Sequence, residues 1–372
     1  MDTKILQIAH GQIIPEYTSG YTDRCYSIFR NANRKIISVG GLTFRDQTTK
    51  EIEGYRSLFL TLYSAIKGNR SFEILLSERI FLRRKYIKRL NELIAESEII
   101  VYEGPWQFPF TKDRIKEKIV VYDAHNVETY LRIGNKYYNK VKDIEKELIY
   151  RADIIFVVSE EDLKNMINIH NADPQKIFLI PHQLSLKEYG WHGIDSNKIV
   201  FIGSMYQPNI DALKVIEHIA EELTQFEFHI IGNINKYPKK KKLPNIIYHG
   251  MVDEKEKDEI LNASLLALNP INTGAGRNVK MVDYMLHGLP IITTEIGLRG
   301  FNLNEIRDYI YIEKIERFKN KILEVSMNRE KLKTDSFKLY DYSKKLYEKE
   351  TNIKAIDVIE RCYDQKFKKV SK

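Results

Sequence analysis

The sequence has little cysteine, no long apolar run and no recognisable export signal. Only Cys25 and Cys362 occur among 372 residues, too few for a disulfide framework, a zinc cluster or a CxxC pair. No stretch approaches the roughly 18 apolar residues that a membrane-spanning helix needs. The first residues, MDTKILQIAH, lack the basic start and apolar run of a signal peptide. These absences argue against a secreted disulfide scaffold or an integral membrane protein, and they predict a cytoplasmic protein.

The excess of positive charge is spread evenly along the chain. The net charge is +8, from 59 Lys and Arg against 51 Asp and Glu. Residues 1–184 carry 28 basic and 24 acidic side chains, and the remaining residues carry 31 and 27, so each part contributes +4. A nucleic-acid-binding protein would gather its basic residues in a patch, arm or tail. The sequence therefore predicts no nucleic-acid partner.

Apolar runs rich in β-branched residues alternate with helical patterns along most of the chain. The strand candidates are KILQIAH, KIISVG, EIIVY, KIVVYD, DIIFVVS and KIFLIP, then KIVFIG, FEFHIIG, NIIYHG, SLLALNP and LPIITT. These runs are nearly continuous, which is typical of parallel strands covered by helices on both faces. Because the chain is about twice the usual domain size, we expect two doubly wound α/β domains.

A segment without periodicity separates the two sets of strands. We predict an N-terminal α/β domain, a linker, a C-terminal α/β domain and a helical tail that packs back toward the first domain, over residues 1–184, 185–197, 198–345 and 346–372. Ligands of such sheets bind at the carboxyl ends of the strands. The two domains are therefore expected to face each other across a central cleft that holds the functional site.

The most informative segment follows the strand SLLALNP. Gly274 and Gly276 form a loop that is expected to open a helix carrying Arg277, Lys280 and Asp283. Glycines let a backbone approach a phosphate closely, and the N–H groups at a helix start bind anions. Three-residue spacing places the two cations and the carboxylate on one helix face. A solvated basic face is the ordinary alternative, and no GxxxxGK[ST] sequence supports P-loop chemistry.

The wider pattern is more specific. The block G-x-G-R-x-x-K-x-x-D-Y-M-x-x-G-x-P-I-I-T-T, with FIGSMYQPNIDAL upstream, resembles the nucleotide-sugar domain of group 1 glycosyltransferases. These are retaining enzymes of family 4 with the GT-B fold, in which two Rossmann-like domains face a central cleft. The first half agrees more loosely, through DAHNVE, a glycine loop and the helical tail. The resemblance implies a nucleotide-sugar donor as substrate and no cofactor or metal, and the absence of a DxD sequence agrees with this.

The resemblance carries roles onto individual residues. Arg277 and Lys280 would hold the donor diphosphate, and Asp283 would bind the donor ribose. The other donor-side positions are Gly20, Gly203, Asn209, Gly274, Gly276 and Gly297. Two departures stand out, because Ala275 occupies a position that is acidic in many relatives and no basic residue follows the strand KIVFIG. Either the donor contacts are redistributed onto Arg277, Lys280 and backbone amides, or donor binding is poor or absent.

In the first half, four residues lie just past predicted strands or at a helix start. His125 matches the family's cleft histidine and is the predicted catalytic residue, near the donor sugar. Gly20 would offer backbone amides to the donor phosphates or to an acceptor hydroxyl, or lie in a plain loop. Trp106 and Glu128 are assigned to the acceptor side, with core packing and a favourable helix-dipole contact as their ordinary alternatives.

Basic and apolar residues interleave from Arg79 to Arg89 with no acid among them. Such a stretch can form an amphipathic helix that lies on anionic lipid, although a core-packing helix with a solvated basic face has the same pattern. The membrane interpretation implies a peripheral location at the inner face of the membrane.

These observations predict a retaining glycosyltransferase of the hexosyltransferase type. It would move a sugar from a nucleotide-diphosphate sugar to a hydroxyl of a carbohydrate, lipid-linked or small-molecule acceptor. Two alternatives stay open, a nucleotide-sugar epimerase on the same fold and a catalytically silent glycosyltransferase-like partner subunit.

Overall fold

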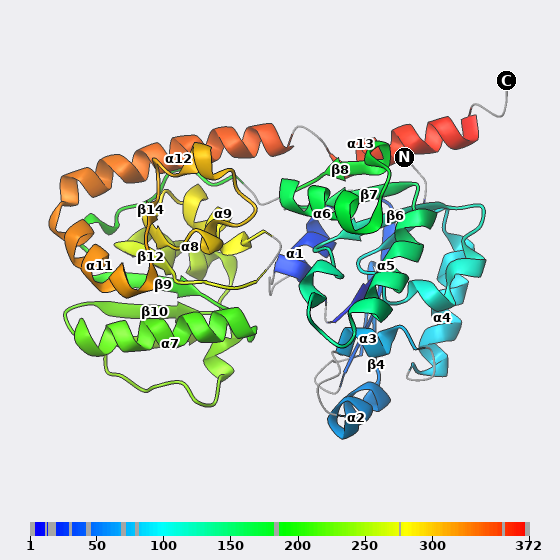
Figure 1. Cartoon of the computed structure of the whole chain (residues 1–372), viewed down its shortest axis with the longest axis horizontal. Helices are drawn as coiled ribbons and strands as arrows, with labels where there is room; N and C mark the ends of the chain where they lie inside the picture. The colour runs from blue at the N-terminus through cyan, green and yellow to red at the C-terminus, as the bar shows by residue number, and fades with distance from the viewer. Residues whose placement is uncertain are drawn as a thin grey trace. The chain divides into compact units, whose positions relative to one another are not determined.

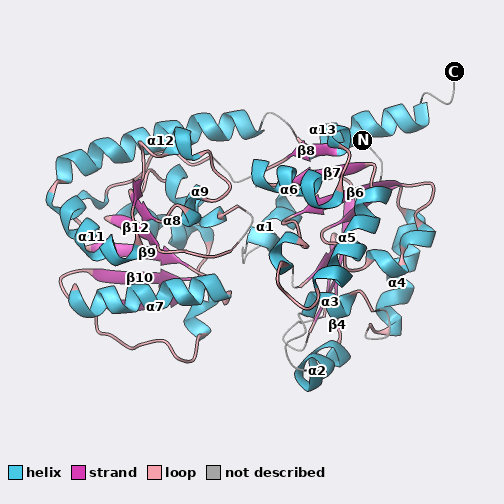
Figure 2. Cartoon of the chain, in the orientation of Figure 1, coloured by secondary structure: helices cyan, strands magenta, loops and turns pink. Residues whose placement is uncertain are grey.

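A computed structural model describes residues 4–11, 13, 20–29, 32–41, 46–67, 72–78, 82–181, 186–274, 277–351 and 354–368. The chain divides into two compact units, the first formed by Met1–Gln183 with Ile353–Lys372 and the second by Leu184–Asn352. Each unit is built around one sheet, drawn in magenta in Figure 2.

The sheet of unit 1 has the order β3-β4-β2-β1-β5-β6-β7-β8, and only the β3–β4 pairing is antiparallel. Its strands are β1 (Ile5–His10), β2 (Arg34–Gly40), β3 (Gln47–Thr48), β4 (Ile52–Arg56), β5 (Ile99–Tyr102), β6 (Ile119–Ala124), β7 (Ile154–Val157) and β8 (Ile177–Leu179). Its helices are α1 (Gly20–Ser27), α2 (Leu58–Lys67), α3 (Phe72–Leu76), α4 (Arg84–Glu96), α5 (Tyr138–Arg151), α6 (Glu160–His170) and α13 (Ala355–Tyr363). The predicted strands of the first half are confirmed, and β3 and β4 are additions.

Both faces of this sheet are buried, as the continuous apolar strands predicted. Successive residues of a strand point to opposite faces, so Ile100 and Ile99 of β5 belong to two different cores. Helices α3 to α6 supply side chains to the first core and α13 to the second. The C-terminal segment from residue 353 thus belongs to unit 1. The sequence placed the start of the tail that packs toward the first domain at residue 346.

Unit 2 contains a six-stranded, wholly parallel sheet of order β11-β10-β9-β12-β13-β14 (Figure 1). Its strands are β9 (Lys198–Ile202), β10 (Glu227–Ile231), β11 (Ile246–Gly250), β12 (Leu266–Asn269), β13 (Ile291–Thr293) and β14 (Tyr311–Ile312). Its helices are α7 (Gln207–Glu222), α8 (Glu254–Ala263), α9 (Val279–Leu286), α10 (Leu303–Ile306), α11 (Phe318–Met327) and α12 (Arg329–Thr351).

The segment expected to be a linker packs on unit 2 instead. Trp191 is buried in the core of this unit, and its Nε1 donates a hydrogen bond to the Ser264 carbonyl oxygen over 2.7 Å. Gly193 also lies close to Ser264, and a Cβ added to Gly193 would be 1.9 Å from the Ser264 carbonyl oxygen. Trp191 is a large apolar ring in an otherwise polar stretch, and it was the feature of the sequence that could have predicted that residues 186–197 pack on a core.

The basic stretch from Arg79 to Arg89 is not one helix. Residues 79–81 lie outside the described part of the chain, and α4 begins only at Arg84. The apolar side of α4 is buried, with Tyr86 and Leu90 in the core of unit 1. No helix among the described residues is both long and apolar enough to cross a membrane.

Candidate functional site

Polar side chains gather where β1, β5 and β6 of unit 1 end. His10 closes β1, Glu103 directly follows β5, and His125 directly follows β6. Neighbouring parallel strands bring their carboxyl ends to one edge of a sheet, which explains why residues this far apart in sequence meet. Residues Tyr21 and Cys25 of α1 contact the same group from the helix.

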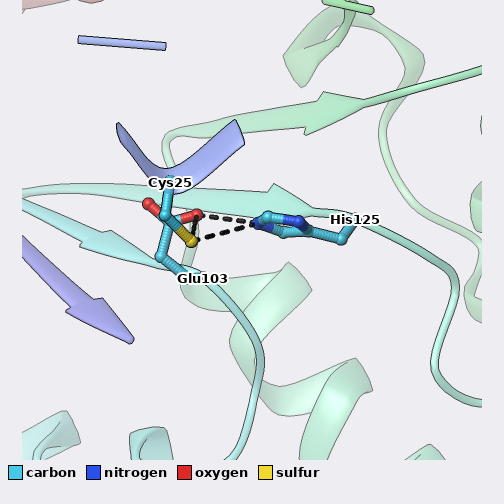
Figure 3. Close-up of side chains that lie close together, drawn as sticks. All are labelled: Cys25, Glu103 and His125. Atoms are coloured by element: carbon cyan, nitrogen blue, oxygen red, sulfur yellow. Dashed lines mark hydrogen bonds and ion pairs between the residues drawn. The ribbon is translucent and has the colours of Figure 1, made fainter. Parts of the chain in front are cut away.

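His125 and Glu103 form a direct hydrogen bond, shown in Figure 3. The ring Nε2 of His125 lies 2.8 Å from Oε2 of Glu103, and the side chains are 8% and 0% exposed. The Cys25 thiol donates to the same Oε2 over 3.4 Å, and Gln7 Nε2 donates to Oε1 over 2.7 Å. Both carboxyl oxygens of Glu103 therefore accept hydrogen bonds inside the protein.

A second buried acid beside His125 is neutralised by an arginine. The guanidinium of Arg24 on α1 binds both carboxyl oxygens of Asp123, and it also donates to the Ile180 carbonyl oxygen over 2.7 Å. The two side chains are 1% and 0% exposed. Such a fully buried pair fixes α1 against the end of β6, because removing one partner would leave an uncompensated charge.

The His125 ring is also held by aromatic contacts. Tyr21 lies between His10 and His125, with 4.5 Å between its ring centroid and each imidazole. The Tyr21 hydroxyl is 3.0 Å from Nδ1 of His10. The imidazole that the sequence singled out is thus clamped between Tyr21 and a carboxylate.

Burial sets the protonation states of this group. Burial lowers the pKa of His125 to about 4, although Asp123 opposes the shift. Burial likewise lowers the pKa of His10 to about 4, and it raises the pKa of Glu103. Desolvation disfavours the charged form of each group, so both imidazoles are neutral at pH 7.

Cys25, Glu103 and His125 present a sulfur, an oxygen and a nitrogen close enough together to hold a metal ion. The 2.8 Å between His125 and Glu103 is an ordinary hydrogen-bond distance. Hydrogen bonds among the protein groups therefore account for the arrangement.

The acceptor-side assignment of Trp106 is corrected by its burial. Its side chain is fully buried, and the Arg132 guanidinium lies 4.9 Å above its ring. A ring covered in this way packs and supports Arg132; it does not stack on a sugar.

Arg132 in turn binds the carboxylate of Glu128. Burial raises the pKa of Glu128 to about 7, with Arg132 opposing.

Gly20 is the first residue of α1, as the sequence predicted, while residues 14–19 of the preceding loop lie outside the described part of the chain. Whether its amide meets a ligand stays a prediction.

In unit 2, two glycines bring the ends of β9 and β10 close together. Gly232 has φ +106°, and a Cβ added there would lie 2.2 Å from the Gly203 carbonyl oxygen. Only glycine fits this approach. At Gly203, chosen from the sequence as a donor-side residue, an added Cβ would lie 2.7 Å from Cε1 of Phe201, so that ring would have to shift.

Lys280 and Asn209 are brought together beyond the end of β9. The ammonium Nζ of Lys280 donates to Oδ1 of Asn209 over 2.6 Å and lies 4.4 Å from the centroid of the Phe201 ring. Burial, and next the nearby Arg299, lower the pKa of Lys280 well below its ordinary value. Within the described residues no carboxylate contacts this ammonium. Lys280 thus supplies positive charge where no basic residue follows β9 in the sequence.

Arg277 lies just before α9, not within it as expected. Its guanidinium lies 4.4 Å from the centroid of the Phe301 ring, and the residue is 7% exposed. Gly300, with φ +83°, packs so closely that an added Cβ would be 2.8 Å from Arg277 carbons. Gly274, with φ +118°, approaches the guanidinium of Arg299, and Gly276 lies outside the described residues.

Asp283 on α9 is paired with a lysine of the neighbouring helix. Its Oδ1 accepts a hydrogen bond from Nζ of Lys257 on α8 over 3.1 Å. Burial opposes protonation of Lys257, but Asp283 and Glu254 outweigh it and raise the lysine pKa. Asp283 keeps its three-residue spacing from Lys280 on α9, and its carboxylate is paired with Lys257; its contact with a ribose stays a prediction.

Gly297 lies in a tight turn after β13. A Cβ added there would meet Oγ1 of Thr293 at 2.2 Å and Nδ2 of Asn269 at 2.6 Å. The Gly297 carbonyl oxygen accepts hydrogen bonds from Asn269 and Asn278. This glycine joins the ends of β12 and β13 to the start of α9.

The structure thus assembles two groups, one at the strand ends of each unit. His125 directly follows β6 in unit 1, and Gly203 directly follows β9 in unit 2, with Asn209, Lys280 and Gly297 on the segments beyond the strands; the ligand roles of these residues stay predictions. Sequence reasoning missed Arg24, Tyr21, His10 and Arg299, because nothing in their local patterns distinguishes them from ordinary loop or helix residues.

Residues 196–328 match the family model described as "Glycosyl transferases group 1". All of this segment belongs to unit 2. The similarity to group 1 glycosyltransferases therefore lies within unit 2. Among curated proteins, an uncharacterised 44.6 kDa protein in the cps region of Klebsiella pneumoniae is 21% identical over 305 residues, 76% of this chain and 73% of its own.

Solved glycosyltransferase structures share the fold of the whole chain. A TarM variant of S. aureus, in complex with Fondaparinux, alpha-GlcNAc-glycerol and UDP, is 14% identical with a TM-score of 0.63, over 98% of this chain and 99% of its own. Anabaena HepE in complex with UDP-glucose is 10% identical with a TM-score of 0.62, over 99% of both chains. The predicted α/β class with two Rossmann-like units of GT-B type is confirmed.

Proposed function

We propose that the protein is a glycosyltransferase that moves a sugar from a nucleotide-diphosphate sugar to a hydroxyl acceptor. The observation that carries this is Lys280, a desolvated cation whose described partners are an amide oxygen and an aromatic ring. Burying an ammonium without a carboxylate is costly, and a phosphate oxygen would compensate it. Its position in the segment that matches group 1 glycosyltransferases supports a donor diphosphate as the ligand.

The mechanism follows from where charge develops. As the sugar leaves, negative charge grows on the departing diphosphate, and Lys280 and Arg277 would stabilise it electrostatically. Neutral His125 of unit 1 would contact the donor sugar, and Asp283 would bind the ribose. We propose a retaining, family 4 hexosyl transfer that needs no metal. Retention is tested by the anomeric configuration of the product, and metal independence by turnover in the presence of a chelator.

Nucleotide binding is the first test. Calorimetric titration of UDP, GDP and ADP into the wild type and into Lys280→Met should show one nucleotide that binds the wild type and binds the variant more weakly. The matching nucleotide sugar should then donate its sugar to a hydroxyl acceptor. Conversion of the donor alone into an isomer would indicate the epimerase. If no nucleotide binds, the proposal fails and a silent partner subunit becomes the better interpretation.

We also propose that unit 1 contacts an anionic membrane from the cytoplasmic side, which would suit a lipid-linked acceptor. Leu58, Phe59 and Leu62 of α2 are 44%, 66% and 60% exposed. Helix α2 lies at the lower edge of unit 1 in Figure 1. Phe59 shares a surface hollow with Arg84 and Lys88 of α4. Exposed apolar side chains beside basic ones are the combination that binds anionic lipid.

Acids limit the basic side of this surface. Arg89 binds Glu53, and Arg83 binds Asp46. The apolar residues of α2 should therefore contribute more to binding than the arginines of the sequence stretch.

Flotation with vesicles of anionic or zwitterionic lipid at low salt tests the membrane contact. We expect the wild type to float with anionic vesicles and a Phe59→Ser/Leu62→Ser double variant to remain unbound. Phe337→Ser, which removes a similarly exposed phenylalanine from unit 2, should bind like the wild type. Equal flotation of all three proteins would contradict the assignment of this surface.

A further inference from the structure

The hydrogen bond between His125 and Glu103 has a consequence for the other ring nitrogen. Nε2 of His125 faces Oε2 of Glu103 at 2.8 Å (Figure 3). Nδ1 is buried and has no hydrogen-bond partner among the described residues. A neutral imidazole carries one proton, so the partner of Nε2 decides whether Nδ1 is a donor or an acceptor.

We infer that Glu103 is a positioning residue, which holds His125 as the Nε2–H tautomer so that the Nδ1 lone pair accepts a hydrogen bond from a hydroxyl group of the substrate. Two donors converge on the Glu103 carboxyl group, the Gln7 amide at Oε1 and the Cys25 thiol at Oε2, and Nε2 of His125 faces the same Oε2. A group surrounded by donors is an acceptor, and that role suits a carboxylate.

The opposite tautomer is less favourable for a second reason. It would require a proton on Glu103 and would leave an N–H at Nδ1 buried without an acceptor. Orphaned buried N–H groups are rarer than under-satisfied acceptors. The Nε2–H form instead leaves a lone pair, whose natural partner is an O–H donor.

The lone pair at Nδ1 of His125 indicates the class of ligand. A lone pair on a neutral ring attracts a hydroxyl and offers nothing to a phosphate. The inference rests on the proposed function in one respect, which is that the hydroxyl belongs to the transferred sugar or to the acceptor. His125 would then orient a sugar hydroxyl as an acceptor; it would not act as a cation.

Glu103→Gln tests this inference because the side-chain amide of Gln7 is held in one orientation and cannot flip to match the new residue. Gln7 donates from Nε2 to the Cys25 carbonyl oxygen over 2.8 Å, and its Oε1 accepts from Arg34. The new carboxamide must therefore direct its oxygen to Gln7 and its NH2 group to His125. An NH2 group donates to Nε2 and forces the proton onto Nδ1.

The tautomer is measured by two-dimensional 1H–15N NMR of the histidine side chains in the full-length protein. His125→Gln identifies the His125 signals. We expect the Nε2–H tautomer in the wild type and the Nδ1–H tautomer in Glu103→Gln. Cys25→Ser keeps a donor to Oε2, and Glu103→Asp keeps a carboxylate, so both should retain the wild-type tautomer. These measurements need no substrate.

Kinetics with the donor identified above give the functional readout. Glu103→Gln should lower kcat about 10- to 100-fold, as expected when a hydrogen bond to the sugar hydroxyl is replaced by an unmatched N–H donor, with recovery toward the wild type in Glu103→Asp. An Nδ1–H tautomer in the wild type, or an unchanged tautomer in a folded Glu103→Gln protein, would overturn the inference. Absence of nucleotide binding would instead overturn the proposed function and leave the tautomer assignment standing.

Discussion

Replacing Lys280 by methionine should weaken nucleotide binding and leave the free protein at least as stable. Methionine keeps the length and volume of the lysine stem and removes the charge. The lost interaction is a charge-assisted hydrogen bond to a phosphate, which contributes about 1.5–3 kcal/mol. At about 1.4 kcal/mol for each factor of ten, the Kd for the nucleoside diphosphate should rise by about 10- to 150-fold.

The stability of the free protein should change in the opposite direction. In the wild type the ammonium is desolvated, with burial lowering its pKa, and it is compensated only by Asn209 and the Phe201 ring. The cation–π contact contributes about 0.5–2 kcal/mol, whereas leaving Asn209 without its donor costs about 1–3 kcal/mol. Removing the desolvation cost offsets these losses. We expect the free energy of unfolding to stay within about 1 kcal/mol of the wild type or to rise.

Lys321→Met is the matched control within the same unit. Lys321 is also largely buried, with 16% of its side chain exposed, but it is paired with Glu313 and Glu324. Its loss should reduce the free energy of unfolding by about 1 kcal/mol and leave the nucleotide Kd unchanged. Urea unfolding and calorimetric titration of the two variants measure both quantities.

The opposite pattern would refute this reasoning. If Lys280→Met loses several kcal/mol of stability and binds nucleotide as the wild type does, Lys280 is a structural residue and the diphosphate lies elsewhere.

Three further predictions concern the same unit. Because burial lowers the pKa of Lys280 in the free protein and a diphosphate would raise it, binding should take up a proton. Nucleotide affinity should therefore fall as pH rises through the pKa of Lys280 in the free protein. Calorimetry in buffers of different ionisation enthalpy measures the protons taken up on binding, and a value of zero would contradict this prediction. Gly300→Ala should lose at least about 1 kcal/mol more than Gly134→Ala in urea unfolding, since both have positive φ but only Gly300 packs against Arg277. Asp283→Asn should weaken nucleoside diphosphate binding about tenfold, and an unchanged Kd would exclude a ribose contact.

The strands could be predicted because their signal is local. Continuous runs such as IIVY and IIFV are buried on both faces of the sheet, and the structure places them in β5 and β7. β3 and β14 have two residues each, too few for any pattern. The expected linker was missed for a related reason, since the burial of Trp191 depends on packing against a strand more than 70 residues away.

The site could be predicted only in part, because its contacts are long-range. The sequence pointed to Lys280 through its spacing from Gly276 and Arg277, but its partner Asn209 lies 71 residues upstream. Asp283 was placed on the same face by helical spacing, yet Lys257 of the preceding helix pairs with it. Helical periodicity says which side chains share a face, and only tertiary packing says what that face meets.

The charges of the two groups indicate what each would bind. In unit 1 the arginine beside His125 is matched by a carboxylate, the Arg24–Asp123 pair, and the buried Nδ1 of the neutral His125 ring has no hydrogen-bond partner among the described residues. In unit 2 the ammonium of Lys280 has no carboxylate partner among the described residues. A group whose arginine is already paired offers no free cation to an anion, because an added negative charge would be desolvated without a counter-charge. An uncompensated cation favours an anion. The two groups therefore favour ligands of different charge.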